Sequence, residues 1–381
     1  MMSEATGLAP MQDLLISSCV ILLGLVGLII GGDLLVRGAS KLAAAARISP
    51  LVIGITVVSF GTSAPELAVT VQAAIAGSPE LAVGNVVGSN IANVLLILGA
   101  AALIAPLAVQ SRIVKVDLPM IFGAALAFWL MALDGVISWV DGAILFAALL
   151  VYLVWSIKQG SGEQEEVQQQ FSDAAEQKSK QPKGGKTMRL AKQGLLLVGG
   201  LVILVISAQG MVAGSTEIAR HFGVSDLVIG LTVVAIGTSL PELVASVVAS
   251  WRGQGDIAVG NVVGSNLFNI LAVLGIGAMV APDGIPVPRD ALYLDIPIMI
   301  AVTFACLPVF FTGCRINRAE GAVLLGYFIA YTTYVVMGAT DASYTRSFEI
   351  AMLGFVIPIT LLGIGYSVYQ SMRMRRANSD C

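Results

Sequence analysis

The chain contains one long segment twice, and this repeat limits the folds that are open to it. Residues 54–99 align with residues 230–275 without a gap, at a constant offset of 176 positions, and 26 of the 46 aligned residues are identical. The identities include Gly, Pro, Glu, Asn, Ser and Thr. Chance similarity between two apolar segments would instead match Leu, Val and Ala. We therefore predict a chain built from two related halves.

Both halves are strongly apolar. Hydrophobic residues make up 57% of the chain and charged residues only 12%, whereas soluble domains carry about 25% charged residues. This composition excludes a soluble enzyme with ordinary surface chemistry, a disordered chain and a nucleic-acid-binding protein. A membrane span needs roughly 20 mostly apolar residues. Eleven stretches meet that need, near residues 14–36, 50–76, 81–105, 115–133, 137–157, 193–219, 226–250, 257–280, 291–312, 319–338 and 348–370.

The positive residues indicate how these spans are oriented. With the N-terminus outside, the predicted inner loops hold 18 of the 21 Lys and Arg residues, as the positive-inside rule requires. Five spans separate equivalent positions of the two copies, so the copies enter the membrane from opposite sides. Inverted repeats with Gly- and Pro-interrupted helices are typical of secondary transporters, whose sites lie near the membrane midplane.

The predicted fold is therefore an all-α polytopic membrane protein. It has two inverted five-helix repeats, which supply ten transmembrane helices, plus one additional C-terminal transmembrane helix. The N-terminus is expected outside and the C-terminus in the cytoplasm. The predicted segments are a first repeat at 14–157, a cytoplasmic polar linker at 158–192, a second, inverted repeat at 193–338, the extra helix at 348–370 and a basic cytoplasmic tail at 371–381.

Two glutamates occupy equivalent places in the repeat. Glu66 lies in the motif GTSAPE and Glu242 in GTSLPE, each well inside a predicted span. A carboxylate at this depth is costly unless it faces a cavity and a partner. No Lys or Arg lies at comparable depth in the sequence. The natural partner is a bound cation, and the alternative is a pair of protonated structural glutamates.

The residues just before each glutamate offer further oxygen atoms. Pro65 and Pro241 each remove a helical donor, so we expect a helix break that frees carbonyl oxygens near 59–62 and 235–238. Hydroxyl groups in apolar helices often bond back to their own helix. Adjacent hydroxyls beside a break and a carboxylate favour ion binding instead. These hydroxyls belong to Thr62, Ser63, Thr238 and Ser239.

A polar stripe follows on the next span of each copy, in the segments GNVVGSNIAN (84–93) and GNVVGSNLFN (260–269). Its members recur every four residues and therefore share one helical face. They are Asn85, Ser89 and Asn93 in the first copy and Asn261, Ser265 and Asn269 in the second. Asn90 and Asn266 fall off this face, where they could cap the helix break.

The candidate ligand atoms are all oxygens. Hard cations such as Ca²⁺ take 6–8 oxygen ligands, and soft-metal ligands are missing from the motifs, which disfavours Zn²⁺ and Cu⁺. The same oxygens could instead hold several Na⁺ ions. Competition for shared carboxylates would couple the two fluxes without ATP, for which the sequence has no GxxxxGK[ST] motif.

These motifs resemble the two α-repeats of the Ca²⁺/cation antiporter superfamily, and most closely its Na⁺/Ca²⁺ exchanger branch of bacterial type. The resemblance covers the first ten spans and is most specific at GTS-x-PE and GNVVGSN in both copies. K⁺-dependent members are similar but carry an aspartate where Asn269 stands, so the amide speaks against K⁺ co-transport.

The resemblance also implies roles for individual residues. Glu66 and Glu242 would be shared Ca²⁺ and Na⁺ ligands, and Thr62 and Thr238 would complete the central Ca²⁺ site. Ser63 and Ser89, with the carbonyl of Ser59, would line one Na⁺ site. Ser239 and Ser265, with the carbonyl of Ala235, would line its mirror image, and Asn93 and Asn269 would flank the middle.

We therefore expect a multi-pass antiporter of the cell inner membrane that exchanges Na⁺ for Ca²⁺ by alternating access. The lipid bilayer and the two ions are its expected partners, with no cofactor and no obligate protein partner. In the family's mechanism, spans 1 and 6 slide across spans 2–3 and 7–8. Four glycines on spans 1 and 6 would permit smooth contact with spans 2–3 and 7–8, namely Gly31, Gly32, Gly38 and Gly214.

Two alternatives remain open. A Ca²⁺/H⁺ antiporter could use the same scaffold, because buried glutamates can carry protons. A cation channel belongs to another class, and channels usually need symmetric rings around a continuous pore. An enzyme is not expected, because the sequence offers no nucleophile–base pair.

Overall fold

The computed structural model describes residues 8–46, 48–175, 186–224, 232–233, 235–311, 315–340, 345–358 and 365. Its first half consists of α1 (Leu8–Ala46), α2 (Pro50–Ile53), η1 (Gly54–Val58), α3 (Ser59–Thr62), α4 (Ala64–Ile75), α5 (Pro79–Ala92), η2 (Asn93–Leu98), α6 (Gly99–Ile104), β1 (Leu107–Ala108), η3 (Ile113–Asp117), α7 (Leu118–Met131), η4 (Ala132–Asp134), β2 (Val136–Ile137) and α8 (Trp139–Ala175). The η elements are π-helical turns within longer helices, except η4, which is a 3₁₀ turn.

The described part of the second half has a similar order of elements, without counterparts of α2, η1 and η4 and with α17 and η8 added. It consists of α9 (Lys186–His221), α11 (Ala235–Thr238), α12 (Leu240–Trp251), α13 (Gly255–Phe268), η6 (Asn269–Leu274), α14 (Gly275–Val280), β3 (Ile285–Pro286), η7 (Ala291–Asp295), α15 (Ile296–Phe311), β4 (Arg315–Ile316), α16 (Arg318–Ala339), α17 (Thr345–Ala351) and η8 (Met352–Val356).

The helices are long and apolar enough for a polytopic membrane protein, as the composition predicts. Among the described residues, seven helices could each cross a membrane, or eight if the bent pair Pro50–Thr62 and Ala64–Ile75 is one span. The count of eleven remains a prediction. The predicted spans at 226–250 and 348–370 lie partly outside the described residues, and the helix Ala291–Cys306 is apolar but shorter.

The predicted helix break in the first copy is present. Helices α3 and α4 meet at Ser63 with a bend of 45°. Pro65 stands in the first turn of α4, where its missing N–H would have no helical partner in any case. In the second copy, α11 and α12 are separated in the same way at Ser239, and Pro241 stands in the first turn of α12.

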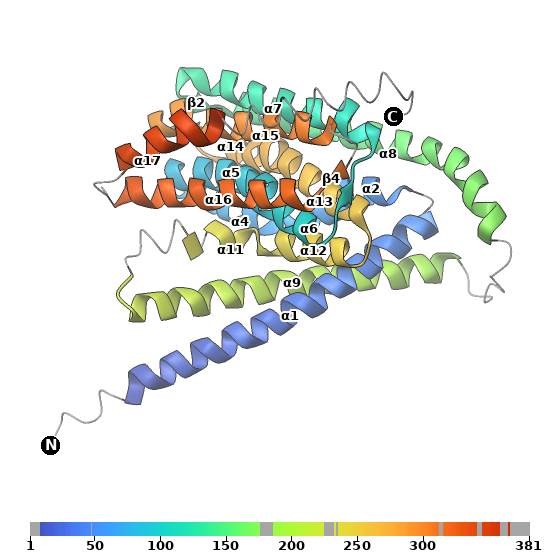
Figure 1. Ribbon diagram of the computed structural model, residues 1–381, viewed down its shortest axis with the longest axis horizontal. Helices are drawn as coiled ribbons and strands as arrows, with labels where there is room; N and C mark the ends of the chain where they lie inside the picture. Colours follow the sequence, from blue (N-terminus) through green and yellow to red (C-terminus); the bar gives the residue numbers. More distant parts are fainter. Residues whose placement is uncertain are drawn as a thin grey trace.

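The long helices α1 and α9 lie side by side along one edge of the bundle (Figure 1). Glycines allow this contact, because a Cβ at Gly31 would lie 2.8 Å from the carbonyl oxygen of Gly200, and a Cβ at Gly38 would lie 2.6 Å from the backbone nitrogen of Leu197. A Cβ at Gly214 would lie 2.9 Å from the carbonyl oxygen of Ser17. Small residues permit such close helix packing in membranes. The expectation that these three glycines contact spans 2–3 and 7–8 is wrong, because they pack α1 and α9 against each other.

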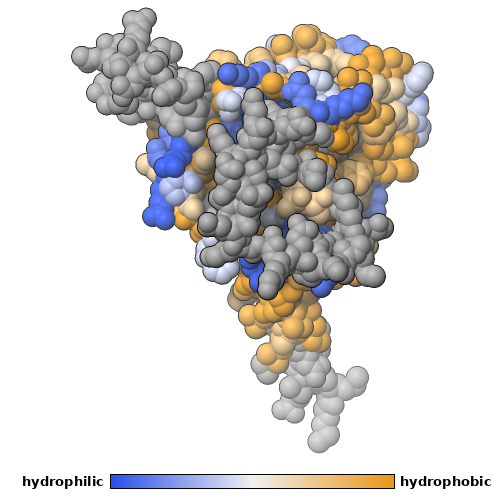
Figure 2. Space-filling view, turned by 90° about the vertical axis from the view of Figure 1, so that its right-hand side faces the viewer, coloured by the Kyte–Doolittle hydropathy of each residue, from blue (hydrophilic) through white to orange (hydrophobic). Residues whose placement is uncertain are grey.

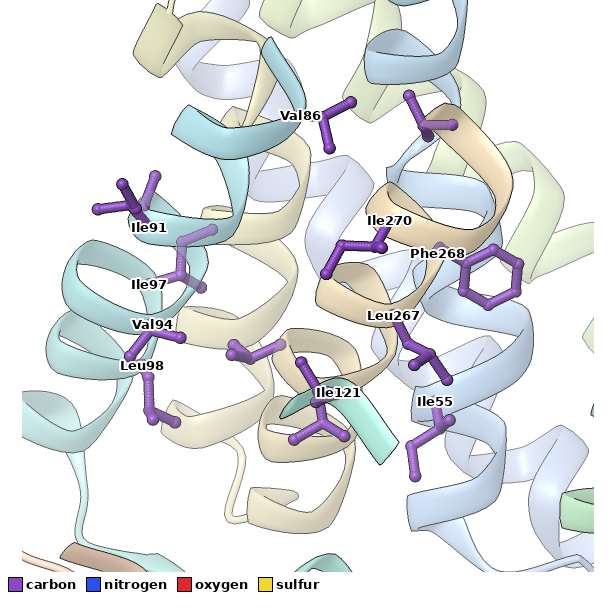
Figure 3. Close-up of a cluster of buried hydrophobic side chains, with 14 of the residues drawn as sticks. Ile55, Val86, Ile91, Val94, Ile97, Leu98, Ile121, Leu267, Phe268 and Ile270 are labelled. Carbon is purple, nitrogen blue, oxygen red and sulfur yellow. The ribbon is translucent and has the colours of Figure 1, made fainter. Parts of the chain in front are cut away.

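The central helix of the bundle is α13, in which every residue from Ile257 to Phe268 is buried. It packs across the two halves against α2, η1 and α3. Figure 3 shows Ile55 of η1 beside Leu267 and Phe268 of α13, with buried side chains of α5 and η2 nearby. The core therefore joins the two copies of the repeat and does not divide into two separate bundles.

Two short antiparallel strand pairs, which the sequence did not predict, also connect the halves. Strand β1 pairs with β4, with Leu107 opposite Ile316, and β2 pairs with β3, with Val136 opposite Pro286. Each pair takes one strand from each half.

Apolar side chains cover much of the visible outer surface, including the part of α1 that extends below the bundle (Figure 2), as expected for contact with lipid.

Helix α8 continues to Ala175 and α9 begins at Lys186, so part of the predicted linker at 158–192 is helical. The Gln-, Glu- and Ala-rich sequence at 161–175 explains this, because these residues favour helices.

Candidate ion-binding site

The two glutamates lie directly after the helix breaks. Glu66 stands in the first turn of α4 and Glu242 in the first turn of α12. Each side chain is only 1% exposed. Among the described residues, neither glutamate forms an ion pair with a Lys, Arg or His side chain.

Each glutamate is bonded by a serine from the other half of the chain. The hydroxyl of Ser63 donates to Oε1 of Glu242 at 3.1 Å. The hydroxyl of Ser239 donates to Oε1 of Glu66 at 3.2 Å, and its oxygen lies 3.4 Å from the hydroxyl oxygen of Ser89. The two copies of the repeat therefore form one shared polar site, in which each break contacts the opposite carboxylate.

The polar stripe reaches this site through two π-helical turns. Asn93 is the first residue of η2 and Asn269 the first residue of η6. Both are buried, with 1% exposure each. A π-turn inserts an extra residue into an α-helix and is frequent at functional sites. The repeat thus carries the same helix irregularity at the same residue in both copies.

Several buried polar atoms of these residues have no hydrogen-bond partner within the described part of the chain. They are Oε2 of Glu66, Oε2 of Glu242, both amide atoms of Asn93, Oδ1 of Asn269 and the hydroxyl oxygen of Ser265. Buried polar groups are nearly always paired, because an unpaired group loses its hydration without compensation. Five of these six atoms are oxygens, so a cation is the partner that would satisfy them.

The remaining predicted residues lie at or beside the break. Thr62 is fully buried, and its hydroxyl donates to Oδ1 of Asn261 at 3.1 Å, with a longer contact of 3.4 Å to the carbonyl of Ser59. That carbonyl also accepts the backbone N–H of Ser63 at 2.9 Å. In the second copy, Thr238 ends α11 and Ala235 begins it.

The hydroxyl of Ser59 has a structural role that the sequence did not suggest. It donates to the carbonyl of Gly54 at 2.7 Å and lies 3.0 Å from the carbonyl oxygen of Asn261 on α13. Ser59 therefore holds the first break against the central helix of the other half. Its equivalent in the second copy, Ala235, has no hydroxyl, so the two breaks are supported differently.

Two further hydroxyl residues, Thr70 and Ser246, were missed at the sequence level. They are fully buried and each accepts a hydrogen bond from an asparagine of the polar stripe. They stand at equivalent positions, 176 residues apart, but as different residue types. A search for identical residues passes over such a pair, whereas a search for equivalent hydroxyls would have found it.

Comparison with known proteins decides the family. A family model described as sodium/calcium exchanger protein matches residues 16–158 and 192–337. The chain belongs to the sodium/calcium exchanger family. It is 34% identical over 339 residues to the sodium/calcium exchanger MaX1 of Methanosarcina acetivorans, which covers 82% of this chain and 96% of the relative.

A further relative and a solved structure agree with this chain in sequence and in fold. CaxA of Alkalimonas amylolytica is 41% identical over 324 residues, which covers 84% of this chain and 98% of CaxA. A solved structure of the sodium–calcium exchanger NCX_Mj, soaked with 10 mM Na⁺ and zero Ca²⁺, matches with a TM-score of 0.71 at 30% identity. That match covers 84% of this chain and 98% of NCX_Mj. The expected family and the multi-pass, all-α membrane fold are confirmed, and the family consists of transporters, not enzymes.

Proposed function

We infer that this protein is a secondary-active antiporter that exchanges Na⁺ for Ca²⁺ across the membrane. The observation that carries this inference is the shared site, in which two buried carboxylates from the two halves are bonded by serines of the opposite half and each keep one oxygen without a partner among the described residues. Two ionised glutamates match the charge of one Ca²⁺, and the surrounding neutral oxygens suit a hard cation. The named exchangers among the relatives support the same pair of ions.

The proposed roles of the site residues follow the arrangement of the two breaks. Glu66 and Glu242 would be ligands common to Ca²⁺ and Na⁺, and Thr62 and Thr238 would complete the central Ca²⁺ site. The proposed lateral Na⁺ sites combine Ser63, Ser89 and the Ser59 carbonyl on one side, and Ser239, Ser265 and the Ala235 carbonyl on the other. Asn93 and Asn269 would flank the middle. The unpaired buried atoms of Glu66, Glu242, Ser265, Asn93 and Asn269 support the assignment of these five residues.

The proposed topology has eleven spans in the inner membrane. Two inverted five-helix halves would enclose the site near the midplane, with the N-terminus outside and the C-terminus in the cytoplasm. The two separate matches of the family model, at 16–158 and 192–337, support a chain of two homologous halves. The ions bind as substrates, so the proposal includes no cofactor.

Alternating access is the proposed mode of transport. Helices α1 and α9 would slide together over the helices that carry the site. Their close mutual contact at Gly31 and Gly38 supports movement as one unit. On the site side, a Cβ at Gly32 would lie 2.9 Å from Cγ1 of Val244 on α12, so α1 also packs closely against the helix that carries Glu242.

Counter-ion dependence tests the proposed function directly. The full-length protein would be reconstituted in lipid vesicles and ⁴⁵Ca²⁺ uptake measured under an imposed Na⁺ gradient with pH clamped. We expect Na⁺-driven uptake that saturates with Ca²⁺. Glu66→Gln and Glu242→Gln should each abolish exchange, because each removes a charge that the ion requires, while the purified variants remain folded.

The same vesicles separate the alternatives. Uptake that follows a pH gradient and ignores Na⁺ would indicate a Ca²⁺/H⁺ antiporter. Flux that needs no counter-ion and does not saturate at carrier rates would indicate a channel. Normal Na⁺-driven uptake by both glutamate variants would contradict the proposed site.

A further inference from the structure

A cluster of three charged residues connects α1 with α12, the helix that carries Glu242. The carboxylate of Asp33 on α1 forms an ion pair through Oδ1 with the guanidinium of Arg252, which caps the C-terminal end of α12. Its other oxygen, Oδ2, lies 2.8 Å from Nε of Arg37, one turn further along α1. Asp33 therefore has one partner on its own helix and one at the end of a helix of the proposed site.

The ion pair with Arg252 extends a close contact between the two helices. A Cβ at Gly32 would lie 2.9 Å from Cγ1 of Val244 and 3.2 Å from Cγ2 of Val248, both on α12. Asp33 follows Gly32 directly, and Arg252 lies one turn beyond Val248. The apolar contact and the ion pair therefore join α1 to α12 continuously, up to the C-terminal end of α12.

The repeat would place an equivalent pair between α9 and the end of α4, but the residues there carry no charge. At the offset of 176 positions, Asp33 corresponds to Gln209 and Arg252 to Ala76. Ala76 caps α4 as Arg252 caps α12, so the two helix ends are equivalent. Among the described residues, α9 also has much less contact with α4 than α1 has with α12. The charged contact thus belongs to one of the two halves only.

We propose that the ion pair of Asp33 with Arg252 is a latch that holds α1 on α12 and favours the conformation of this structure. The inference rests on the proposed function, in which α1 slides over the helices of the site. Sliding separates Asp33 from Arg252, because Arg252 is fixed at the end of α12. The opposite conformation gains no ion pair in exchange, because Gln209 and Ala76 are uncharged. Arg37 moves together with Asp33, since both lie on α1.

The latch affects the two membrane faces in opposite ways. On the proposed topology Arg252 lies at the inner face, so the latch closes that end and favours access to the site from outside. The apparent affinity at a face is reduced by the fraction of the protein that is open to it, so the ratio of the outer to the inner KM follows the conformational equilibrium directly. Asp33 is 24% exposed and Arg252 29%, and an ion pair of such exposure shifts an equilibrium roughly twofold to fivefold.

The test measures KM for Ca²⁺ separately at the two faces of the full-length protein. Right-side-out membrane vesicles present the outer face to the medium and everted vesicles the inner face, and Na⁺-driven ⁴⁵Ca²⁺ uptake is recorded in both. We expect Asp33→Asn and Arg252→Gln each to raise the ratio of the outer to the inner KM roughly twofold to fivefold. An unchanged or lower ratio in either variant would overturn the proposal.

The cluster itself supplies a matched control. Arg37→Gln removes the partner of Asp33 that lies on the same helix, so it should leave the ratio of the two KM values at that of the wild type. Exchange of the charges, by Asp33→Arg together with Arg252→Asp, rebuilds a pair between α1 and α12 and should restore the ratio. A ratio in Arg37→Gln as high as in Asp33→Asn, or failure of the exchange to restore it, would count against the latch.

Thiol labelling separates the latch from the proposed function, because it requires no transport. Val248 is only 8% exposed and lies against Gly32, so a cysteine at this position becomes accessible to maleimide when α1 moves away. In purified Val248→Cys protein whose native cysteines are replaced by serine, Asp33→Asn should raise the labelling rate roughly twofold to fivefold, and Arg37→Gln should not. Absence of Na⁺-driven uptake in the wild type would refute the antiporter assignment alone, whereas equal labelling rates in these two variants would refute the latch.

Discussion

Gly260 lies where the central helix α13 touches the first half, and Gly260→Ala tests that contact. An added Cβ would lie 2.7 Å from the carbonyl oxygen of Leu51 and 3.2 Å from Cα of Gly54. Both neighbours are backbone atoms, so no side chain can rotate away. Ordinary contact begins at 3.4 Å, and α13 would have to move by roughly 0.7 Å at this point. Such overpacking typically costs about 1–3 kcal/mol of stability.

This displacement also reaches the site, because Asn261 is the next residue. Its bonds with Thr62 at 3.1 Å and Ser59 at 3.0 Å would stretch to about 3.7 Å, beyond hydrogen-bond range. Since each hydrogen bond contributes about 1 kcal/mol, we expect Ca²⁺ binding to weaken by up to about fivefold for each bond lost, in addition to the loss of stability.

The assay combines thermal unfolding of the purified protein, with and without Ca²⁺, and the KM for Ca²⁺ in vesicles. Gly326→Ala in α16 is the matched control, because a Cβ there would meet nothing within 4 Å. The control should unfold at the wild-type temperature or slightly above it. Wild-type unfolding and wild-type KM in Gly260→Ala would refute the close packing of α13 against η1.

Two further predictions concern other buried polar groups. Ser63→Ala and Ser239→Ala each remove the hydrogen bond to the glutamate of the other half. Each should therefore raise KM for Na⁺ in vesicle uptake. An unchanged KM for Na⁺ in both variants would contradict the role of these serine–glutamate bonds between the halves. Arg112 and Asp117 form a buried ion pair at 3.6 Å, with side chains 5% and 0% exposed, so Arg112→Gln should lower the unfolding free energy by about 3–5 kcal/mol. Arg37→Gln, whose parent side chain is 53% exposed, should change it by less than about 1 kcal/mol, and equal effects of the two substitutions would refute this reasoning.

The features that could be predicted from sequence depend on strong local or environmental constraints. Pro65 limits how the helix can pass through the break, and the bend appears at Ser63. Glu66 and Glu242 stand out because a carboxylate has few tolerable environments inside a membrane, and both are buried at one polar site. The glycines of α1 predicted close helix contact correctly but mostly with the wrong partner, because Gly31 and Gly38 face α9 and only Gly32 faces a site helix, α12.

The features that could not be predicted depend on how the halves pack together. Nothing near Ser63 in the sequence indicates that it bonds Glu242 and not Glu66, which is only three residues away. The π-turn that begins at Asn93 has no local sequence signal, because its other residues are Val, Leu and Ile, which are common throughout the apolar segments of this chain. The extension of α8 to Ala175 was missed for another reason. Polar composition alone suggested a linker, although residues of that composition also form solvated helices.

The crossed bonding of the site gives a physical reason for coupled transport. Each glutamate has one oxygen bonded to a serine of the other half and one without a partner among the described residues. On the proposed mechanism, sliding of α1 and α9 across an empty site would keep two uncompensated carboxylates out of water, at a cost of several kcal/mol for each charge. Bound Ca²⁺ or bound Na⁺ ions remove that cost by neutralising both groups. The carboxylates that require a cation for stability would therefore also prevent the return of an empty carrier, which makes exchange obligatory.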